Sequence, residues 1–225
     1  MLNYEVPAVM LDALLPAGVE IDRWQGRLYV SVVGFLFRDT RVLGISVPGH
    51  RTFEEINLRF YVRRHVGGEV RRGVVFIREL VPRRAIATVA RLLYNEPYRS
   101  LPMRHRIGAP NDGVLEREYA WRVGGAWTRI VTSTSGPATA LVPGSEEEFI
   151  TEHYWGYTRQ RDGGTVEYRV AHPRWNVWTA HDARIEGDVR AVYGDAFAEV
   201  LAGPLISAFV ADGSAITVYP PRRIR

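Results

Sequence analysis

The sequence predicts a β-dominated α+β fold. Short segments rich in β-branched and aromatic residues recur at spacings of about 8–12 residues, with glycine-rich turns between them. One stretch, residues 83–94, instead carries apolar side chains at a helical period. Many short strands of this kind are typical of a sandwich or a closed barrel. No internal repeat or linker-like stretch divides the chain, so we expect a single domain over residues 1–225.

The first elements follow from local signals. Residues 12–15, ended by Pro16, predict a short helix. Residues 27–37 predict a strand, in which Gly34 is a candidate β-bulge. Residues 41–52 are rich in glycine and proline and predict a loop.

The clearest strand covers residues 55–62 and pairs with residues 74–80 across a glycine turn. Its alternation separates an apolar face from a polar one, which consists of Glu55, Asn57, Arg59 and Tyr61. The helix over residues 83–94 follows, and Asn95 and Pro97 end it.

The second half of the chain reads as hairpins and short helices. We expect three hairpins, formed by residues 115–121 with 127–133, 154–160 with 165–171, and 205–210 with 215–219. Between the first two hairpins we expect a loop over 135–145 and a helical turn at 146–148. Between the last two we expect a strand over 176–185 and a helix over 195–201.

Composition excludes several reaction classes. All 29 basic residues are arginine, and the sequence contains neither lysine nor cysteine. A lysine Schiff base, a pyridoxal-phosphate anchor, a cysteine nucleophile and a thiolate metal site are therefore excluded. The net charge is +4, but the arginines are scattered among 25 acidic residues, so we do not expect a nucleic-acid partner.

The sequence lacks the patterns typical of a signal peptide, of a membrane helix and of a metal site. Residues 1–18 lack the basic start of a signal peptide, and no apolar run approaches the ~20 residues of a membrane helix. We expect a soluble cytoplasmic protein without a membrane partner. Apart from a loose pair, His172 and His181, the six histidines lack the spacing of metal ligands, so we expect no metal, and we expect no cofactor.

Two segments are candidates for function. The polar face of residues 55–62 is either a solvent-exposed strand face or the inner wall of a barrel, where it could bind an anion and move a proton. Residues 94–99 are either a helix stop with packing aromatic residues or a functional loop at a barrel mouth.

Several motifs in fixed order resemble a known family. They are Val6-Pro7, residues 14–18, residues 56–62, residues 73–76, residues 90–98, residues 149–154 and His172-Pro173 with Trp175. Together they resemble domain-of-unknown-function family 2071, which is similar to acetoacetate decarboxylase. The resemblance implies an antiparallel β-barrel or cone with a few peripheral helices and a small central cavity.

The same resemblance implies which residues line that cavity. In the decarboxylase two adjacent lysines follow a proline, and here Tyr98 and Arg99 follow Pro97. Glu55 would correspond to its active-site glutamate, whereas the arginine near its N-terminus has no counterpart in Tyr4-Glu5. Schiff-base decarboxylation is therefore not expected, although the fold is.

Two main functions stay open. The first is an enzyme that isomerises, hydrates or cyclises a small oxo compound, with Glu55 and Tyr98 as acid–base groups. The second is a non-catalytic module that binds a small anionic or carbonyl-containing ligand. In both, the binding residues are Asn57, Arg59, Tyr61, Tyr94 and Arg99. A basic nucleic-acid-associated protein is the least supported function, and a homo-oligomer is compatible with the sequence.

Overall fold

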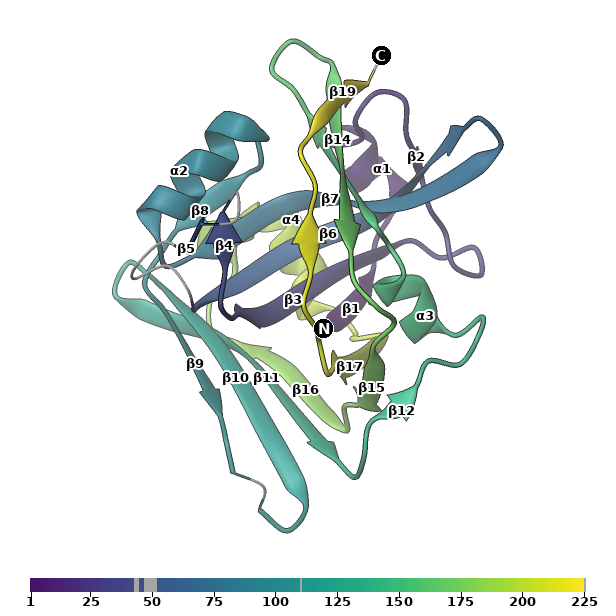
Figure 1. The fold of residues 1–225 in the computed structure, drawn as a ribbon. Coiled ribbons are helices and arrows are strands. Elements are labelled where there is room, and N and C mark those ends of the chain that lie inside the picture. The colour runs from purple at the N-terminus through teal and green to yellow at the C-terminus, as the bar shows by residue number, and fades with distance from the viewer. Residues whose placement is uncertain (43–44, 47–51, 110, 225) are drawn as a thin grey trace.

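Strands dominate the chain (Figure 1). The computed structural model describes residues 1–42, 45–46, 52–109 and 111–224. The helices in these residues are α1 (Ala8–Asp12), α2 (Arg84–Leu93), α3 (Glu146–Thr151) and α4 (Arg190–Ala202). The prediction of a β-dominated α+β fold is confirmed.

Counted over the described residues, the larger sheet has 13 strands. Its main path is, in order, β12 (Thr139–Ala140), β15 (Asn176–Thr179), β17 (Ser207–Ala211), β1 (Leu2–Glu5), β3 (Tyr29–Phe37), β6 (Phe53–Val66), β7 (Glu69–Val81), β13 (Trp155–Arg159), β14 (Thr165–Ala171) and β18 (Thr217–Val218). Off this path, β2 (Glu20–Ile21) pairs with β6, β8 (Tyr98–Ser100) with β7, and β19 (Arg222–Ile224) with β14. The sheet is mixed, because β7 pairs in parallel with both β8 and β13. In the described residues the path runs between two ends, so a closed barrel stays a prediction.

A second sheet lies beside the first (Figure 1). It has four strands in the order β16 (Asp182–Glu186), β11 (Ala126–Ser135), β10 (Val114–Val123) and β9 (Met103–Ile107). The short strands β4 (Arg41–Val42) and β5 (Ile45–Ser46) pair with each other. The remainder of the loop expected over residues 41–52 lies largely outside the described residues.

The main core covers the apolar face of β6. Ile56, Leu58, Phe60 and Val62 are all inaccessible to solvent and pack in one cluster with residues of α1, α4 and the second sheet. Each fully buried side chain of this kind contributes about 1.5–3 kcal/mol relative to an exposed one. This face therefore anchors β6 and leaves its polar face turned to the opposite side.

Gly34 is not a β-bulge. It pairs with Ile56 in a regular antiparallel register along β3 and β6. A Cβ at Gly34 would lie 2.6 Å from Cδ1 of Ile130, so a larger residue there would force that side chain of the second sheet to move. The bulge lies instead between Leu58 and Arg59 in the pairing of β6 with β7.

Two predictions about the C-terminal half are wrong. The strand expected over residues 176–185 is two strands, because the chain passes from one sheet to the other at Ala180 and His181. The expected last hairpin does not form either, since β17 pairs with β1 and β15 while β18 pairs with β14. Both errors concern partners distant in sequence, which local turn signals do not specify.

The helices differ from the predictions mainly at their ends. The prediction of a helix over residues 12–15 is wrong, because α1 covers Ala8–Asp12 and shares only Asp12 with that range; it begins after Pro7, whose φ of −65° suits the start of a helix. The helix expected over 195–201 extends back to Arg190 across a kink at Gly194, where φ is 77°. α2 and α3 lie where they were expected, and Ser145 caps α3 by accepting a hydrogen bond from the Glu148 amide at 3.2 Å. Within the described residues, none of the helices has the length and apolar character needed to cross a membrane.

One buried carboxylate connects four strands of the large sheet. Glu167 of β14 is fully buried and forms ion pairs with Arg64 of β6 at 3.0 Å, with Arg71 of β7 at 3.1 Å and with Arg222 of β19. A planar guanidinium suits such contacts better than an ammonium, because it offers several fixed donors. Here arginine has a structural use.

Candidate functional site

The polar face of β6 is turned inward. Glu55, Asn57 and Tyr61 are 3%, 1% and 1% exposed, and Arg59 is partly buried. The solvent-exposed alternative for this face is therefore wrong. On β3 the directly opposite residues include Phe35 and Ser31, so the interior surface continues across the neighbouring strand.

Glu55 has two hydrogen-bond donors. The Tyr98 hydroxyl of β8 donates to its Oε2 at 3.0 Å, and Nδ2 of Asn57 donates to its Oε1 at 3.2 Å. Burial raises the pKa of Glu55 to about 7, while both hydrogen bonds and the charge of Arg59 oppose that rise. A carboxyl group with such a pKa can gain or lose a proton near neutral pH.

Two further buried carboxyl groups face the same region. Glu79 of β7 is 2% exposed and lies opposite Asn57 on one side and Tyr98 on the other. Glu96, in the segment between α2 and β8, is 4% exposed and accepts hydrogen bonds from Thr158 and, at 2.9 Å, from Tyr168. We call Glu55, Asn57, Glu79, Glu96, Tyr98, Thr158 and Tyr168 the carboxyl cluster.

The carboxyl cluster holds protons more tightly than exposed glutamates do. Burial, with the charges of Glu96 and Glu55, raises the pKa of Glu79 well above its usual range. Burial also raises the pKa of Glu96 to about 7, against the hydrogen bonds from Thr158 and Tyr168. The phenol of Tyr98 has a pKa raised well above 10 by burial and by the nearby carboxylates, so it stays a donor.

Because of the bulge in the pairing of β6 with β7, the sequence alone did not identify Glu79 as a member of the site. A regular hairpin would pair Asn57 with Arg78 and place Glu79 on the apolar face. The register shift between Leu58 and Arg59 leaves Ile77 without a partner and moves Glu79 opposite Asn57. Arg78 then lies opposite Leu58, on the other face. Glu96 did lie within the predicted segment 94–99, but only its aromatic and basic neighbours were singled out.

The other predicted residues separate into near and far groups. The Tyr94 ring packs edge-on against Tyr168 at 5.2 Å, next to the carboxyl cluster. Nη2 of Arg59 donates to the Ile150 carbonyl oxygen at 3.3 Å, and its guanidinium lies 5.6 Å from the Tyr61 ring centre. The Tyr61 hydroxyl is 2.6 Å from Ser31 Oγ. These contacts extend the polar surface along β6 from the cluster.

Arg99 does not join the cluster. It follows Tyr98 on β8, and adjacent residues of a strand point to opposite faces. Its Nη1 donates to the Ala191 carbonyl oxygen of α4 at 2.9 Å. The predicted role of Arg99 as the surviving cationic neighbour of the site therefore has no support in the geometry.

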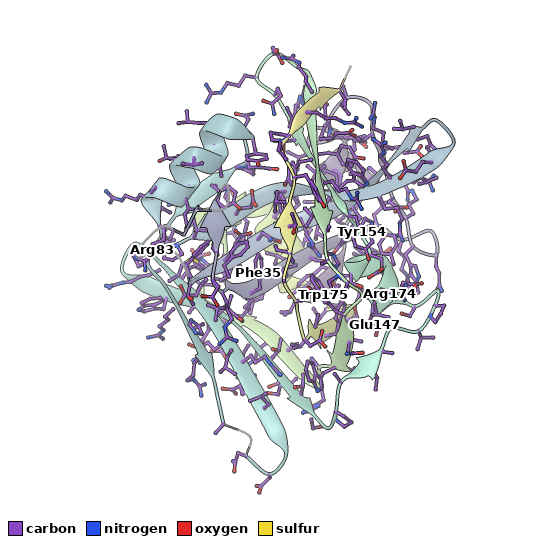
Figure 2. All side chains as sticks on the ribbon, viewed as in Figure 1. Phe35, Arg83, Glu147, Tyr154, Arg174 and Trp175 are labelled. Atoms are coloured by element: carbon purple, nitrogen blue, oxygen red, sulfur yellow. The ribbon has the colours of Figure 1, made fainter. Side chains whose placement is uncertain are left out.

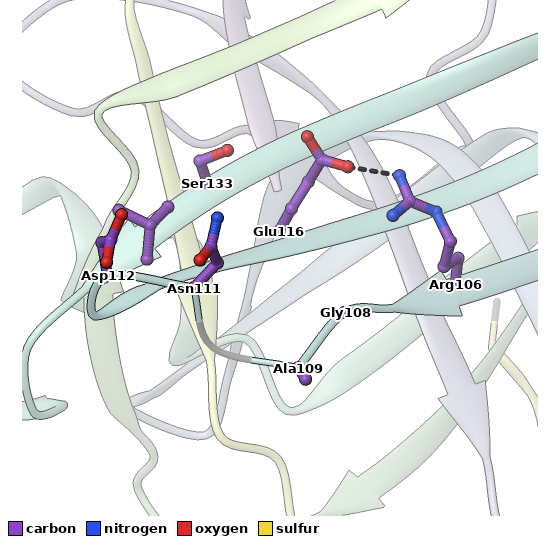
Figure 3. Close-up of a pocket in the computed structure, with 8 residues that line it drawn as sticks. Arg106, Gly108, Ala109, Asn111, Asp112, Glu116 and Ser133 are labelled. Carbon is purple, nitrogen blue, oxygen red and sulfur yellow. Dashed lines mark hydrogen bonds and ion pairs between the residues drawn. The ribbon is translucent and has the colours of Figure 1, made fainter.

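Two other features lie apart from this cluster. A surface pocket of about 450 Å³ sits beside the β9–β10 connection, with Arg106 and Glu116 paired at its wall (Figure 3), and none of its lining residues belongs to the carboxyl cluster. Near α3, Tyr154 and Trp175 (Figure 2) flank His172, with ring centres 4.7 and 4.1 Å away. In the described part of the chain, no group of three or more histidine, aspartate or glutamate side chains is arranged to hold a metal ion.

Solved structures define the class of fold. Acetoacetate decarboxylase from Legionella pneumophila is similar with a TM-score of 0.62 and 12% identity, over 100% of this chain and 83% of that one. The enduracididine biosynthesis enzyme MppR, complexed with pyruvate, is similar with a TM-score of 0.65 and 13% identity, over 99% of this chain and 86% of that one. The chain thus has an acetoacetate decarboxylase-like fold.

Sequence comparison shows the family. Residues 1–215 match domain-of-unknown-function family 2071, described as an uncharacterized conserved protein, and the chain belongs to that family. The uncharacterized protein YqjF of Bacillus subtilis (strain 168) is 29% identical over 192 residues, which are 84% of this chain and 75% of that protein. The family resemblance expected from the sequence is confirmed.

Proposed function

We propose that this protein binds a small oxo compound at the carboxyl cluster and transfers a proton on it by acid–base catalysis. The observation that carries this proposal is the buried Glu55–Tyr98 pair, with a pKa of about 7 at the carboxyl group and a phenol held in its donor form. MppR, which shares the fold, is named as a complex with pyruvate, so a small oxo acid is a reasonable first probe.

The chemistry needs no amine. In its ionised form Glu55 would take a proton from the carbon next to the carbonyl group, and it would return that proton to the same or another carbon. Tyr98 would keep the carboxyl group oriented through its hydrogen bond. Arg59, on the same strand face, lowers the pKa of Glu55 by its charge and would oppose negative charge on the bound ligand.

Proton exchange tests the proposal directly. Pyruvate, acetoacetate and other 2-oxo and 3-oxo acids are incubated with the protein in D₂O, and loss of the α-proton signal is followed by NMR. We expect exchange to be accelerated, and Glu55→Gln to lower the rate by ~100-fold or more. Glu54→Gln is the matched control, because Glu54 is the neighbouring carboxylate on the opposite face, paired with His105 at 2.7 Å.

Two outcomes would redirect or end the proposal. Calorimetric binding of an oxo acid without any exchange, weakened by Arg59→Ala, would replace the enzyme with a non-catalytic binding module. If no oxo compound of the panel binds or exchanges, the proposal fails in both forms.

A further inference from the structure

Among the described residues, three buried acceptor atoms of the carboxyl cluster have no hydrogen-bond donor. They are Oε2 of Glu79, Oε2 of Glu96 and Oδ1 of Asn57. The three residues are 2%, 4% and 1% exposed and come from β7, from the segment before β8 and from β6. Buried acceptors of native proteins are paired in the great majority of cases, so three in one cluster require an explanation.

The donors of the cluster are already engaged elsewhere. Thr158 and Tyr168 both donate to Oε1 of Glu96, which leaves its Oε2 without a donor. Tyr98 and Nδ2 of Asn57 both donate to Glu55. The Tyr98 hydroxyl also interacts with Glu79 and lowers its pKa, but Oε2 of Glu79, Oε2 of Glu96 and Oδ1 of Asn57 keep no donor among the described residues.

The charges of the cluster are also unbalanced. The charge of Glu55 raises the pKa values of Glu79 and Glu96, and the charge of Glu96 raises that of Glu79 further. Among the described residues, Arg59 is the cation whose charge lowers the pKa of Glu55. The β7 bulge produces this imbalance, because it places Glu79 rather than Arg78 opposite Asn57. A positively charged partner with several N–H groups would satisfy both the acceptors and the charge.

We infer that Glu79, Glu96 and Asn57 bind a nitrogen cation of the ligand, an ammonium or guanidinium group, through their three free acceptor atoms. This inference deepens the proposed function and rests on it in one respect, namely that the carbonyl group of the same ligand lies at Glu55 and Tyr98. The substrate class is then a small amino or guanidino oxo compound rather than a simple oxo acid. The alternative is that protons alone occupy the acceptors as neutral carboxyl groups, in which case no cation binds.

Matched probes separate these alternatives. Binding is measured by calorimetry at constant ionic strength for 5-aminolevulinate against levulinate, which differ by one amino group, and for n-propylammonium against tetramethylammonium, which lacks N–H bonds. We expect 5-aminolevulinate to bind at least tenfold more tightly than levulinate, and propylammonium but not tetramethylammonium to bind. Equal affinities within both pairs would overturn the inference.

Variants locate the binding. Glu79→Gln and Glu96→Gln are each expected to weaken 5-aminolevulinate binding at least tenfold, to weaken levulinate binding by a clearly smaller factor, and so to remove most of the advantage of 5-aminolevulinate over levulinate. Glu199→Gln, at an exposed position of α4, is the control and should change neither. Unchanged 5-aminolevulinate affinity in both cluster variants would assign the cation to another surface. Circular dichroism confirms folding, and if one variant does not fold, the other and the wild-type probe pairs still decide.

The same measurements keep the two proposals distinguishable. If α-proton exchange of simple oxo acids depends on Glu55 while the amino group adds no affinity, only the cation inference fails. If propylammonium binds through Glu79 and Glu96 while no oxo compound exchanges, only the proposed catalysis fails.

Discussion

At the scale of single residues, the site depends on a balance around one carboxyl group. Burial raises the pKa of Glu55 to about 7, and the hydrogen bonds from Asn57 and Tyr98 hold it from rising further. Each pKa unit corresponds to about 1.4 kcal/mol between the two protonation states. The Tyr98 hydroxyl thus sets the pH range in which Glu55 can act, in addition to orienting it.

Removing that hydroxyl should shift the pH dependence of the site. In Tyr98→Phe the carboxylate form of Glu55 loses a donor, so its pKa rises above about 7. The rising limb of the α-proton exchange profile should move to higher pH by about one unit, since a charged hydrogen bond contributes roughly 1.5–3 kcal/mol at most. The profile is measured from pH 5 to pH 9, and a ¹³C titration of the glutamate carboxyl signals gives the pKa independently.

Tyr154→Phe is the control for this substitution. The Tyr154 hydroxyl also donates to a glutamate, Glu152, at 2.6 Å, but it lies outside the carboxyl cluster. The pH profile of α-proton exchange in Tyr154→Phe should match that of the wild-type protein. A Tyr98→Phe profile with an unchanged or lowered midpoint would contradict the assigned role of the Tyr98 hydrogen bond.

At the scale of elements, alternation in residues 55–62 was enough to predict which four side chains share a face. It did not predict Glu79, because a bulge of one residue inverts the facing of everything beyond it on β7. Nothing in the local sequence distinguishes Ile77 as the extra residue. Hairpins with tight glycine turns were predicted correctly, as at Gly124-Gly125, since their pairing is local.

Elements whose partners are distant in sequence were predicted poorly. β17 pairs with β1 across most of the chain length, and no turn signal indicates such a contact. β8 joins the sheet in parallel beside β7, which is how Tyr98 reaches Glu55. The family resemblance gave the position of Tyr98, but it also led to Arg99, which the alternation of a strand places on the opposite face.

The pairing of β13 with β14 supports the cluster through one glycine. Gly156 lies directly opposite Tyr168, and a Cβ there would be 2.1 Å from Cζ of that ring. Gly156→Ala must therefore displace Tyr168 from Glu96. We expect a loss of about 1–3 kcal/mol from overpacking and a Tm lower by roughly 2–10 °C.

Gly108→Ala is the control for Gly156→Ala. Its added Cβ would be 3.5 Å from the Glu116 carbonyl oxygen, an ordinary contact, so its Tm should stay near the wild-type value. Calorimetry measures both variants. Equal Tm values for Gly156→Ala and wild type would show that the Tyr168 ring moves at little cost.

At the scale of the whole molecule, buried titratable groups act on stability in two directions. The pKa values of Glu55 and Glu96 rise from 4.5 to about 7, so their contribution is complete below about pH 4.5 and is lost as pH rises through about 7. Burial lowers the pKa of His153 from 6.5 to about 4, so its contribution is lost as pH falls through about 4. Asp22, the carboxylate beside His153, has a pKa lowered to about 2 despite its burial, because Nε of Arg72 donates to it at 2.8 Å and Nε2 of His153 lies 3.4 Å away, and it acts in the same sense at lower pH.

These opposed contributions predict a stability maximum on the acid side of neutral. Between pH 8 and pH 5 Glu55 and Glu96 gain protons in the folded state, and Glu79 also favours its protonated form there, so these three carboxyl groups should raise the free energy of unfolding by more than the buried His153 and the buried amino group of Met1 lower it. Below pH 4 it should fall again. Urea unfolding at pH 8, 6.5, 5 and 3.5 measures the curve. In Glu96→Gln the rise between pH 8 and pH 5 should be smaller by about 2–3 kcal/mol, whereas exposed Glu199→Gln should keep it. If the free energy of unfolding instead falls steadily from pH 8 to pH 5, the carboxyl cluster is already charged in the folded protein. The acid–base role of Glu55 near neutral pH would then lose its physical basis.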